Sequence, residues 1–168
     1  MATTDISMWR RVLRDPQLRE LPYKIETNEH GQLVMSPHTP FHSRHQSRLL
    51  RALDEHVTRR GEATIEFAVE TSKGVKVPDV AWLSDERWAQ IPEEAEASPV
   101  MPELCVEVRS DNNTDAEMNE KRELYLDEGA QEVWICDADG RLRFFDAAGE
   151  RDQSAWAPGC PSVVASAD

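Results

Sequence analysis

Two short apolar segments, each with an acidic residue inside it, most constrain what this chain can fold into. Asp79 lies within residues 77–83 (VPDVAWL), and Glu107 lies within residues 102–110 (PELCVEVRS). Both segments are rich in β-branched residues and are bounded by turn-forming or polar residues, which is typical of buried strands. A carboxylate inside a sheet is costly unless a cation, hydrogen bonds or a metal compensate it. Two such carboxylates on successive strands indicate one shared site, and oxygen ligands are those that Mg²⁺ or Mn²⁺ prefers.

The segment that follows is predicted to be a helix over residues 114–126 and carries a candidate partner for these acids. Its apolar positions Met118 and Tyr125 define a stripe, and Lys121 falls at the edge of that stripe. Side chains alternate along a strand, so Glu107 is expected to point the same way as Cys105 and away from Val106. Lys121 can therefore point toward the sheet and its acids.

The remaining pattern predicts a mixed α/β (α+β) chain. Further helices are expected at 6–14, from about 39 or 41 to 60, and around 87–90, and further strands at 23–26, 32–36, 63–70, 132–137 and 141–146, the last at a sheet edge. The strands at 63–70 and 77–83 are expected to form a hairpin around Lys73-Gly74. The unit 104–136 has the length of a crossover connection, which favours parallel pairing of its two strands.

These elements predict a central mixed β-sheet flanked by helices. At 168 residues the chain is expected to be one domain, with a core at about 20–147 and a weakly structured tail at 148–168. Three widely spaced cysteines without a CxxC pair indicate reduced core thiols at Cys105 and Cys136, with a disulfide or a zinc role as the alternative. With no apolar run of membrane-spanning length and no signal peptide, we expect a cytoplasmic protein without a membrane partner.

The charge of the chain argues against a general nucleic-acid coat protein. The net charge is -13, but residues 1–60 carry ten Lys and Arg against seven Asp and Glu. In the helix starting near residue 40, Arg44, Arg48 and Arg51 share one face, which is either solvated or a contact surface for backbone phosphates. His45, one turn before Leu49, is either a hydrogen-bonded structural residue or part of the site edge.

An ordered set of motifs then spans roughly residues 23–146. They are Pro78-Asp79, Val106-Glu107-Val108, Glu120-Lys121 followed by Tyr125 and Gly129, and Glu132-Val133-Trp134-Ile135 with Asp137. This set resembles the PD-(D/E)XK nuclease superfamily, and most of all its bacterial Uma-type restriction endonuclease family. Tyr23, Ile25 and Glu26, the segment GQLVMSP at 31–37, and His45 also match that family.

The resemblance implies a restriction-endonuclease-like fold and a site for Mg²⁺ or Mn²⁺. The metal would be held by Asp79 and Glu107, with Glu26 as a candidate further ligand, and a lysine would hold or activate the attacking water. The usual lysine, two residues after the second acid, is Arg109 here, and an arginine stays protonated. Lys121 matches the position to which this family has moved its lysine. The alternative is that Asp79 and Glu107 form buried ion pairs with Arg109 and Lys121.

The function that follows is a metal-dependent endonuclease that hydrolyses phosphodiester bonds, with DNA as the expected substrate. Arg44, His45, Arg48 and Arg109 are the candidate substrate contacts. A catalytically inactive binding or assembly module on the same fold is the main alternative, and a nuclease acting on RNA or small nucleotides is another. A homodimer is expected by analogy with nucleases of this fold. The apolar residues Leu142, Phe144 and Phe145 could serve its interface or the core.

Overall fold

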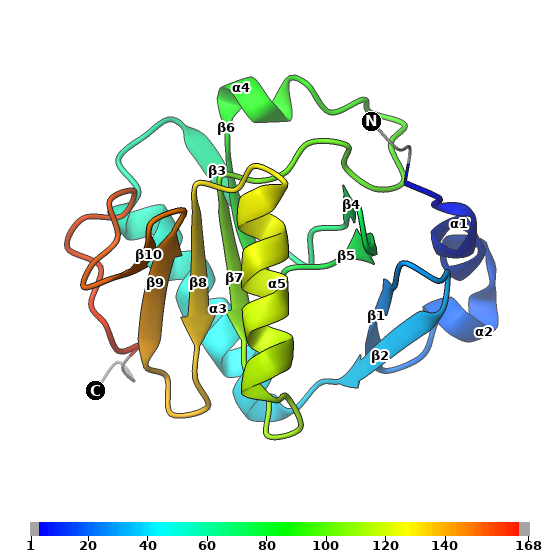
Figure 1. The fold of residues 1–168 in the computed structure, drawn as a ribbon, viewed down its shortest axis with the longest axis horizontal. Coiled ribbons are helices and arrows are strands. Elements are labelled where there is room, and N and C mark those ends of the chain that lie inside the picture. Colours follow the sequence, from blue (N-terminus) through cyan, green and yellow to red (C-terminus); the bar gives the residue numbers. More distant parts are fainter. Residues whose placement is uncertain (1–3, 165–168) are drawn as a thin grey trace.

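The computed structural model describes residues 4–164 and shows a mixed α/β architecture around a six-stranded sheet (Figure 1). The strand order is β10-β9-β8-β7-β6-β3. These strands are β3 (Gly61–Ile65), β6 (Val80–Ser84), β7 (Leu104–Val108), β8 (Glu132–Cys136), β9 (Leu142–Asp146) and β10 (Gly149–Arg151). Strands β7 and β8 pair in parallel, as the crossover length predicts, and the other neighbouring strands pair antiparallel.

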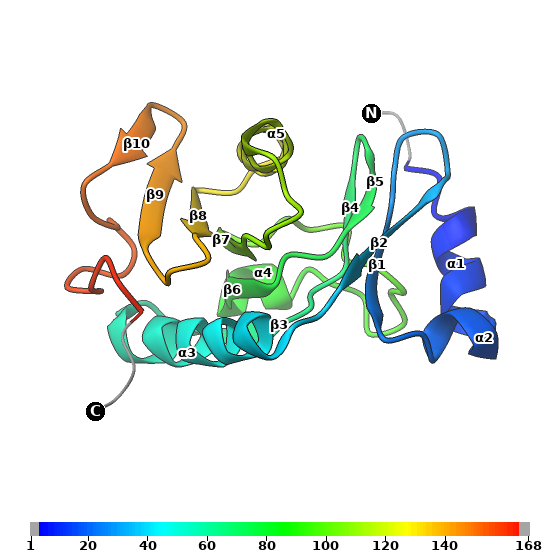
Figure 2. The ribbon, with the colours of Figure 1, turned by 90° about the horizontal axis from the view of Figure 1, so that it is seen from below.

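One long helix covers each face of this sheet (Figure 2). The two helices are α3 (Pro40–His56) and α5 (Asp115–Asp127). Leu49 and Leu53 of α3 pack with Val106 of β7 in one buried cluster. Tyr125 of α5 packs with Cys105 in a cluster on the opposite face. The alternation expected along β7 is therefore confirmed, and Glu107 points toward α5.

A smaller unit of two hairpins and two helices lies beside the sheet (Figure 2). It consists of α1 (Ser7–Arg14), α2 (Pro16–Arg19), the hairpin of β1 (Tyr23–Thr27) with β2 (Leu33–Pro37), and the hairpin of β4 (Val69–Thr71) with β5 (Gly74–Lys76). Trp9, Ile25 and Val75 bury their side chains in a third apolar cluster. This cluster fixes β1 against β5, and through them it positions the residues of β1 that point the other way.

The prediction of one continuous strand over residues 63–70 was wrong. Glu66 adopts a φ of 50°, a left-handed conformation that ends β3. The chain then forms β4, which turns back on β5, whereas β3 pairs antiparallel with β6. The turn at Lys73-Gly74 therefore joins β4 to β5. Strand β6 starts at Val80, so Asp79 lies immediately before the strand.

Two predicted boundaries also differ from the structure, and one helix was not predicted. Helix α3 ends at His56, not near residue 60, because Val57 is extended, with a ψ of 118°. The short helix α4 (Asp85–Trp88) starts two residues earlier than expected, where the side chain of Ser84 accepts a hydrogen bond from the Arg87 backbone. Pro16 ends α1 as expected but also starts α2, whose cap is the Asp15 side chain.

The C-terminal segment is more structured than expected. Residues 149–151 form β10, which pairs with β9, so β9 is not the edge strand. Ala157 and Cys160 pack in the cluster of Leu49, whereas residues 165–168 of the expected tail lie outside the described part. Leu142, Phe144 and Phe145 are buried in the two main clusters, so their role is core packing. The three cysteines are free and buried.

The described helices include none long and apolar enough to cross a membrane.

Gly74 holds the β4–β5 hairpin close against β1. Its φ is +91°, and a Cβ atom at this position would lie 2.6 Å from the carbonyl oxygen of Thr27, the last residue of β1. A side chain there would be strained and would also push against backbone that cannot give way cheaply.

Replacing Gly74 with alanine should therefore lower the free energy of unfolding by more than about 2 kcal/mol. Gly31→Ala is the matched control, because Gly31 also has a positive φ, +70°, but nothing lies within 4 Å of its added Cβ. The control should lose about 1 kcal/mol. Urea denaturation measures both losses. Equal losses would show that the close approach of Gly74 to Thr27 does not affect the free energy of unfolding.

Candidate active site

Four elements and the segment before β6 bring polar side chains, most of them titratable, to one buried cluster. Its members are Lys24 and Glu26 of β1, His42 and Gln46 of α3, Asp79 before β6, Glu107 of β7, and Lys121 and Tyr125 of α5. Lys24 and Glu26 are two residues apart in a strand and so share a face, opposite the buried Ile25. The structure thus brings together Asp79, Glu107, Lys121 and Glu26, as the sequence predicts.

Asp79 is fully buried, and its carboxylate oxygens have different partners. Oδ2 accepts a hydrogen bond of 2.7 Å from the Val108 backbone N–H. Oδ1 accepts one of 3.0 Å from Lys24 Nζ and lies 3.3 Å from Nε2 of His42. Burial alone would raise the pKa of Asp79, but Lys24, His42 and the Val108 N–H together hold this pKa well below its usual range. Asp79 is therefore an ionised carboxylate at neutral pH.

Glu107 also divides its two oxygens between different partners. Oε1 accepts a hydrogen bond of 2.7 Å from the Tyr125 hydroxyl and lies 3.2 Å from Lys121 Nζ. Oε2 lies 3.2 Å from Lys24 Nζ. Burial raises the pKa of Glu107 above its ordinary value, and the two lysines oppose that rise. Burial also keeps the pKa of Tyr125 well above its ordinary value, so its hydroxyl stays a donor.

Glu26 completes the set of buried carboxylates. Its Oε1 accepts the Val77 backbone N–H at 2.8 Å, and its Oε2 lies 2.9 Å from Lys121 Nζ. Burial would raise the pKa of Glu26, but Lys121 and Lys24 bring it below its ordinary value. Three carboxyl groups therefore face two ammonium groups. The side chain of Lys24 is 8% exposed and that of Lys121 is 23% exposed, so Lys121 is the lysine open to the neighbouring cavity.

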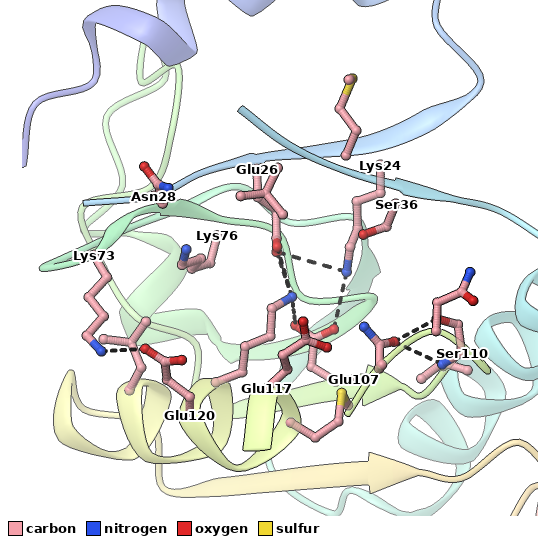
Figure 3. Close-up of a pocket in the computed structure, with 18 of the residues that line it drawn as sticks. Lys24, Glu26, Asn28, Ser36, Lys73, Lys76, Glu107, Ser110, Glu117 and Glu120 are labelled. Carbon is pink, nitrogen blue, oxygen red and sulfur yellow. Dashed lines mark hydrogen bonds and ion pairs between the residues drawn. The ribbon is translucent and has the colours of Figure 1, made fainter. Parts of the chain in front are cut away.

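The cavity beside this cluster has a volume of about 560 Å³ and lies between the β1–β2 hairpin and α5 with the loop before it (Figure 3). The chain has four lysines, and all of them line this cavity: Lys24, Lys73, Lys76 and Lys121. Within residues 4–164, no arginine lines it. Val34 and Met35 give the hairpin side an apolar surface, and both are exposed.

The four other predicted contact residues lie elsewhere. Arg109 pairs with Asp115 at the start of α5, so it is not the buried partner of either strand acid. Arg44 is exposed on α3, and Arg48 donates to the Val164 carbonyl at 3.4 Å.

His45 lies 3.2 Å from the Ala138 carbonyl, which fits its structural reading. None of Arg44, His45, Arg48 and Arg109 is among the described residues that line the cavity. The expected substrate contacts at these positions are therefore not supported.

Sequence reasoning missed Lys24, His42 and Gln46. Side chains two residues apart in a strand share a face, so the position of Lys24 relative to Glu26 on β1 could have indicated it. His42 and Gln46 are four apart on α3 and so share a face, which turns toward Asp79, with Gln46 donating to the Asp79 carbonyl at 2.8 Å. Nδ1 of His42 is buried and has no hydrogen-bond partner within the described part of the chain.

A divalent metal is compatible with the donor chemistry of this cluster. Asp79 Oδ1 and Glu107 Oε2 both lie 3.0–3.2 Å from Lys24 Nζ, so they face one point. Mg²⁺ is usually held by one or two carboxylates and keeps several waters. With the side chains placed as they are, residues 4–164 contain no group of three or more His, Cys, Asp or Glu that could hold a metal ion. The donor set fits Mg²⁺ or Mn²⁺ on the condition that the ammonium between the two oxygens moves.

The mixed sheet with an Asp–Glu–Lys cluster at its end defines a restriction-endonuclease-like α/β protein. Residues 15–152 match the Uma2 family, described as putative restriction endonuclease, and the chain belongs to this family. It is similar to the crystal structure of a putative nuclease of DUF820 from Anabaena variabilis, with a TM-score of 0.67 and 18% identity over 83% of this chain and 87% of that one. This likeness shows a shared fold. No curated protein matches the chain.

The hydrogen bond from Tyr125 to Glu107 gives a direct test of the cluster. Tyr125→Phe removes one donor from a buried carboxylate and should lower the free energy of unfolding by about 1.5–3 kcal/mol. The chain's other tyrosine, Tyr23, is 42% exposed, and Tyr23→Phe should change stability by less than about 0.5 kcal/mol. Denaturant titration of both variants measures the difference, and a Tyr125→Phe protein as stable as the control would contradict the geometry.

Proposed function

We propose that this chain is a metal-dependent nuclease that hydrolyses phosphodiester bonds, with DNA as its substrate. The observation that carries the proposal is that Asp79 and Glu107 turn one oxygen each toward the same point, the Lys24 ammonium. Lys24 and Glu107 line the lysine-rich cavity, and Asp79 is buried behind them. The family to which the chain belongs supports the reaction class.

Asp79 and Glu107 are the residues that would hold Mg²⁺ or Mn²⁺. The ion would supply positive charge to the scissile phosphate and lower the pKa of water beside it. The protein's part is to keep the two oxygens in place. The Val108 N–H fixes Asp79 through its other oxygen, and the Tyr125 hydroxyl fixes Glu107 in the same way. Glu26 stays a candidate further ligand, and in the structure it holds Lys121.

Lys121 is the proposed catalytic lysine. Its Nζ is held by Glu26 and Glu107 and is partly open to the cavity. An ammonium at this place can orient the attacking water and stabilise the charge that develops on the phosphate. Because its α5 helix packs on the sheet through Tyr125, the position of Lys121 is set by the same core that positions Glu107.

The proposed substrate contacts are Lys73 and Lys76, which line the cavity beyond Lys121. Lys76 is about half-buried and donates to the Thr27 carbonyl, and Lys73 pairs with Glu120. In this proposal both ammonium groups contact phosphates next to the scissile one. The net charge of -13 implies weak non-specific attraction to nucleic acid, so binding should depend on the site and its metal.

An inactive binding or assembly module stays the second candidate, and one observation favours it. Each of the three buried carboxylates already has an ammonium partner, as in a purely structural ion-pair network. Metal-dependent cleavage separates the two candidates, because the fold is common to both. Cytoplasmic location and pairing of two copies to cut two strands stay predictions, and light scattering measures the pairing.

The test combines calorimetric titration with Mg²⁺ or Mn²⁺ and nicking of a supercoiled plasmid by the same samples. Asp79→Asn should weaken metal binding by at least about a hundredfold, because it removes a ligand charge. Asp54→Asn, at an exposed position of α3, is the control and should leave binding unchanged. Lys121→Met should retain metal binding but lower the cleavage rate by at least about a hundredfold.

Cleavage without metal, or equal cleavage by Asp79→Asn and Asp54→Asn, would contradict the proposal. Metal binding without nicking of DNA would direct the same assay to RNA and to short nucleotides. A wild-type protein that neither binds metal nor cleaves any of these substrates would leave the binding module as the function.

A further inference from the structure

The carboxylate oxygens of the site are not equivalent. Asp79 Oδ2 is engaged by the Val108 N–H, and Glu107 Oε1 is engaged by Tyr125 and Lys121. The two oxygens that face each other are Asp79 Oδ1 and Glu107 Oε2. Lys24 Nζ lies between them, at 3.0 Å and 3.2 Å. Asp79 and Glu107, the two acids that would hold a divalent ion, thus both contact this ammonium.

The surroundings of Lys24 Nζ consist of oxygen atoms, as those of a bound cation do. It donates to the Val77 carbonyl at 3.0 Å as well as to the two acids, and Glu26 Oε1 lies 4.0 Å away. An ammonium has three hydrogens, and these three contacts use all of them. Lys24 therefore acts in the structure as the resident counter-ion of Asp79 and Glu107.

An ammonium and a divalent ion cannot share this point. Mg²⁺ binds its oxygens at about 2.0–2.1 Å, so the two carboxylates would have to close around it and leave no room for Nζ. The two cations would also repel each other at contact distance. The backbone of β1 is anchored by Ile25 in the apolar cluster with Trp9 and Val75, so the side chain is the part that can move. The cavity that Lys24 lines gives its flexible stem a place to go.

We propose that Lys24 competes with the divalent metal for the position between Asp79 and Glu107 and must withdraw into the cavity when the metal binds. The inference rests on the proposed metal site. Lys24 is in this view a positioning residue that keeps the carboxylates compensated in the metal-free protein. Because only the withdrawn state can bind metal, the apparent affinity of the wild type is reduced by the fraction of molecules in that state.

Lys24→Met is the first test, because methionine keeps the apolar stem and removes the ammonium. Calorimetric titration with Mn²⁺ should give a dissociation constant at least about tenfold lower than that of the wild type. Lys76→Met is the matched control, because Lys76 lines the same cavity but donates to a backbone carbonyl. The control should change the dissociation constant by less than about threefold, because it removes one positive charge from the cavity but no competitor from the metal position.

Thermal unfolding of the same variant supplies a readout independent of catalysis. In EDTA, Lys24→Met should unfold at a lower temperature than the wild type, since its carboxylates lose a partner. Saturating Mn²⁺ should raise its midpoint by more than it raises that of the wild type.

A wild-type experiment keeps the proposal testable even where Lys24→Met does not fold. All four lysines line the cavity, so labelling lysine with ¹⁵N at Nζ gives signals from this region alone. Addition of Mg²⁺ should speed exchange of the Lys24 ammonium hydrogens with water. Those of Lys73, which pairs with Glu120, should not change. An unchanged Lys24 signal in a protein that binds Mg²⁺ would overturn the proposal.

The failures of the two proposals can be told apart. Metal binding by the wild type with equal or weaker binding by Lys24→Met would overturn the competition and leave the metal-dependent nuclease standing. Metal binding by Lys24→Met alone would support the competition and count against a metal-dependent wild-type enzyme. Absence of binding in both proteins would overturn both proposals.

Discussion

The site depends on one electrostatic constraint, which is that three buried carboxylates must be compensated where the sheet meets the β1–β2 hairpin. Glu26, Asp79 and Glu107 are each less than 4% exposed, so water cannot stabilise their charges. Lys24 and Lys121 do so instead, and they come from elements on opposite sides of the cluster. The N-terminal hairpin is therefore part of the site, because it delivers both a carboxylate and a lysine.

The break in the sheet before β6 explains how Asp79 can serve this role. The pairing of β6 with β7 ends at Val80 and Val106. The next N–H of β7 on that side, that of Val108, is therefore free to bond a side chain. Asp79 accepts it, while its own carbonyl accepts from Gln46 and from the Glu66 backbone. The irregular backbone at Glu66 lets the chain leave β3, form the β4–β5 hairpin and return to this point. A regular strand through residues 63–83 would not place the carboxylate there.

Sequence patterns predicted the strands β6 to β9, the crossover around α5 and the meeting of Asp79, Glu107 and Lys121, because each depends on local periodicity or on neighbouring strands. They failed where the answer depends on tertiary contacts. The left-handed Glu66 has no glycine to mark it. Arg44 and Arg48 share a basic face of α3, but core packing determines which face of this helix turns toward the site. That face carries His42 and Gln46, which contact Asp79. The strand period places Lys24 on the same face as Glu26, but nothing local indicates that this face meets Asp79 and Glu107.

Lysines but no arginines line the cavity within residues 4–164, and the buried cluster shows a physical reason for this. A guanidinium binds carboxylates in a fixed bidentate fork, whereas an ammonium is a compact charge on a flexible stem. An arginine at position 24 would hold Asp79 and Glu107 in one arrangement, while a lysine can compensate them and still leave. Arg109 shows the other behaviour, since it is engaged by Asp115 outside the cluster and leaves Glu107 to the lysines. The proposed exchange of the Lys24 ammonium for a divalent ion therefore favours lysine at the centre of the site.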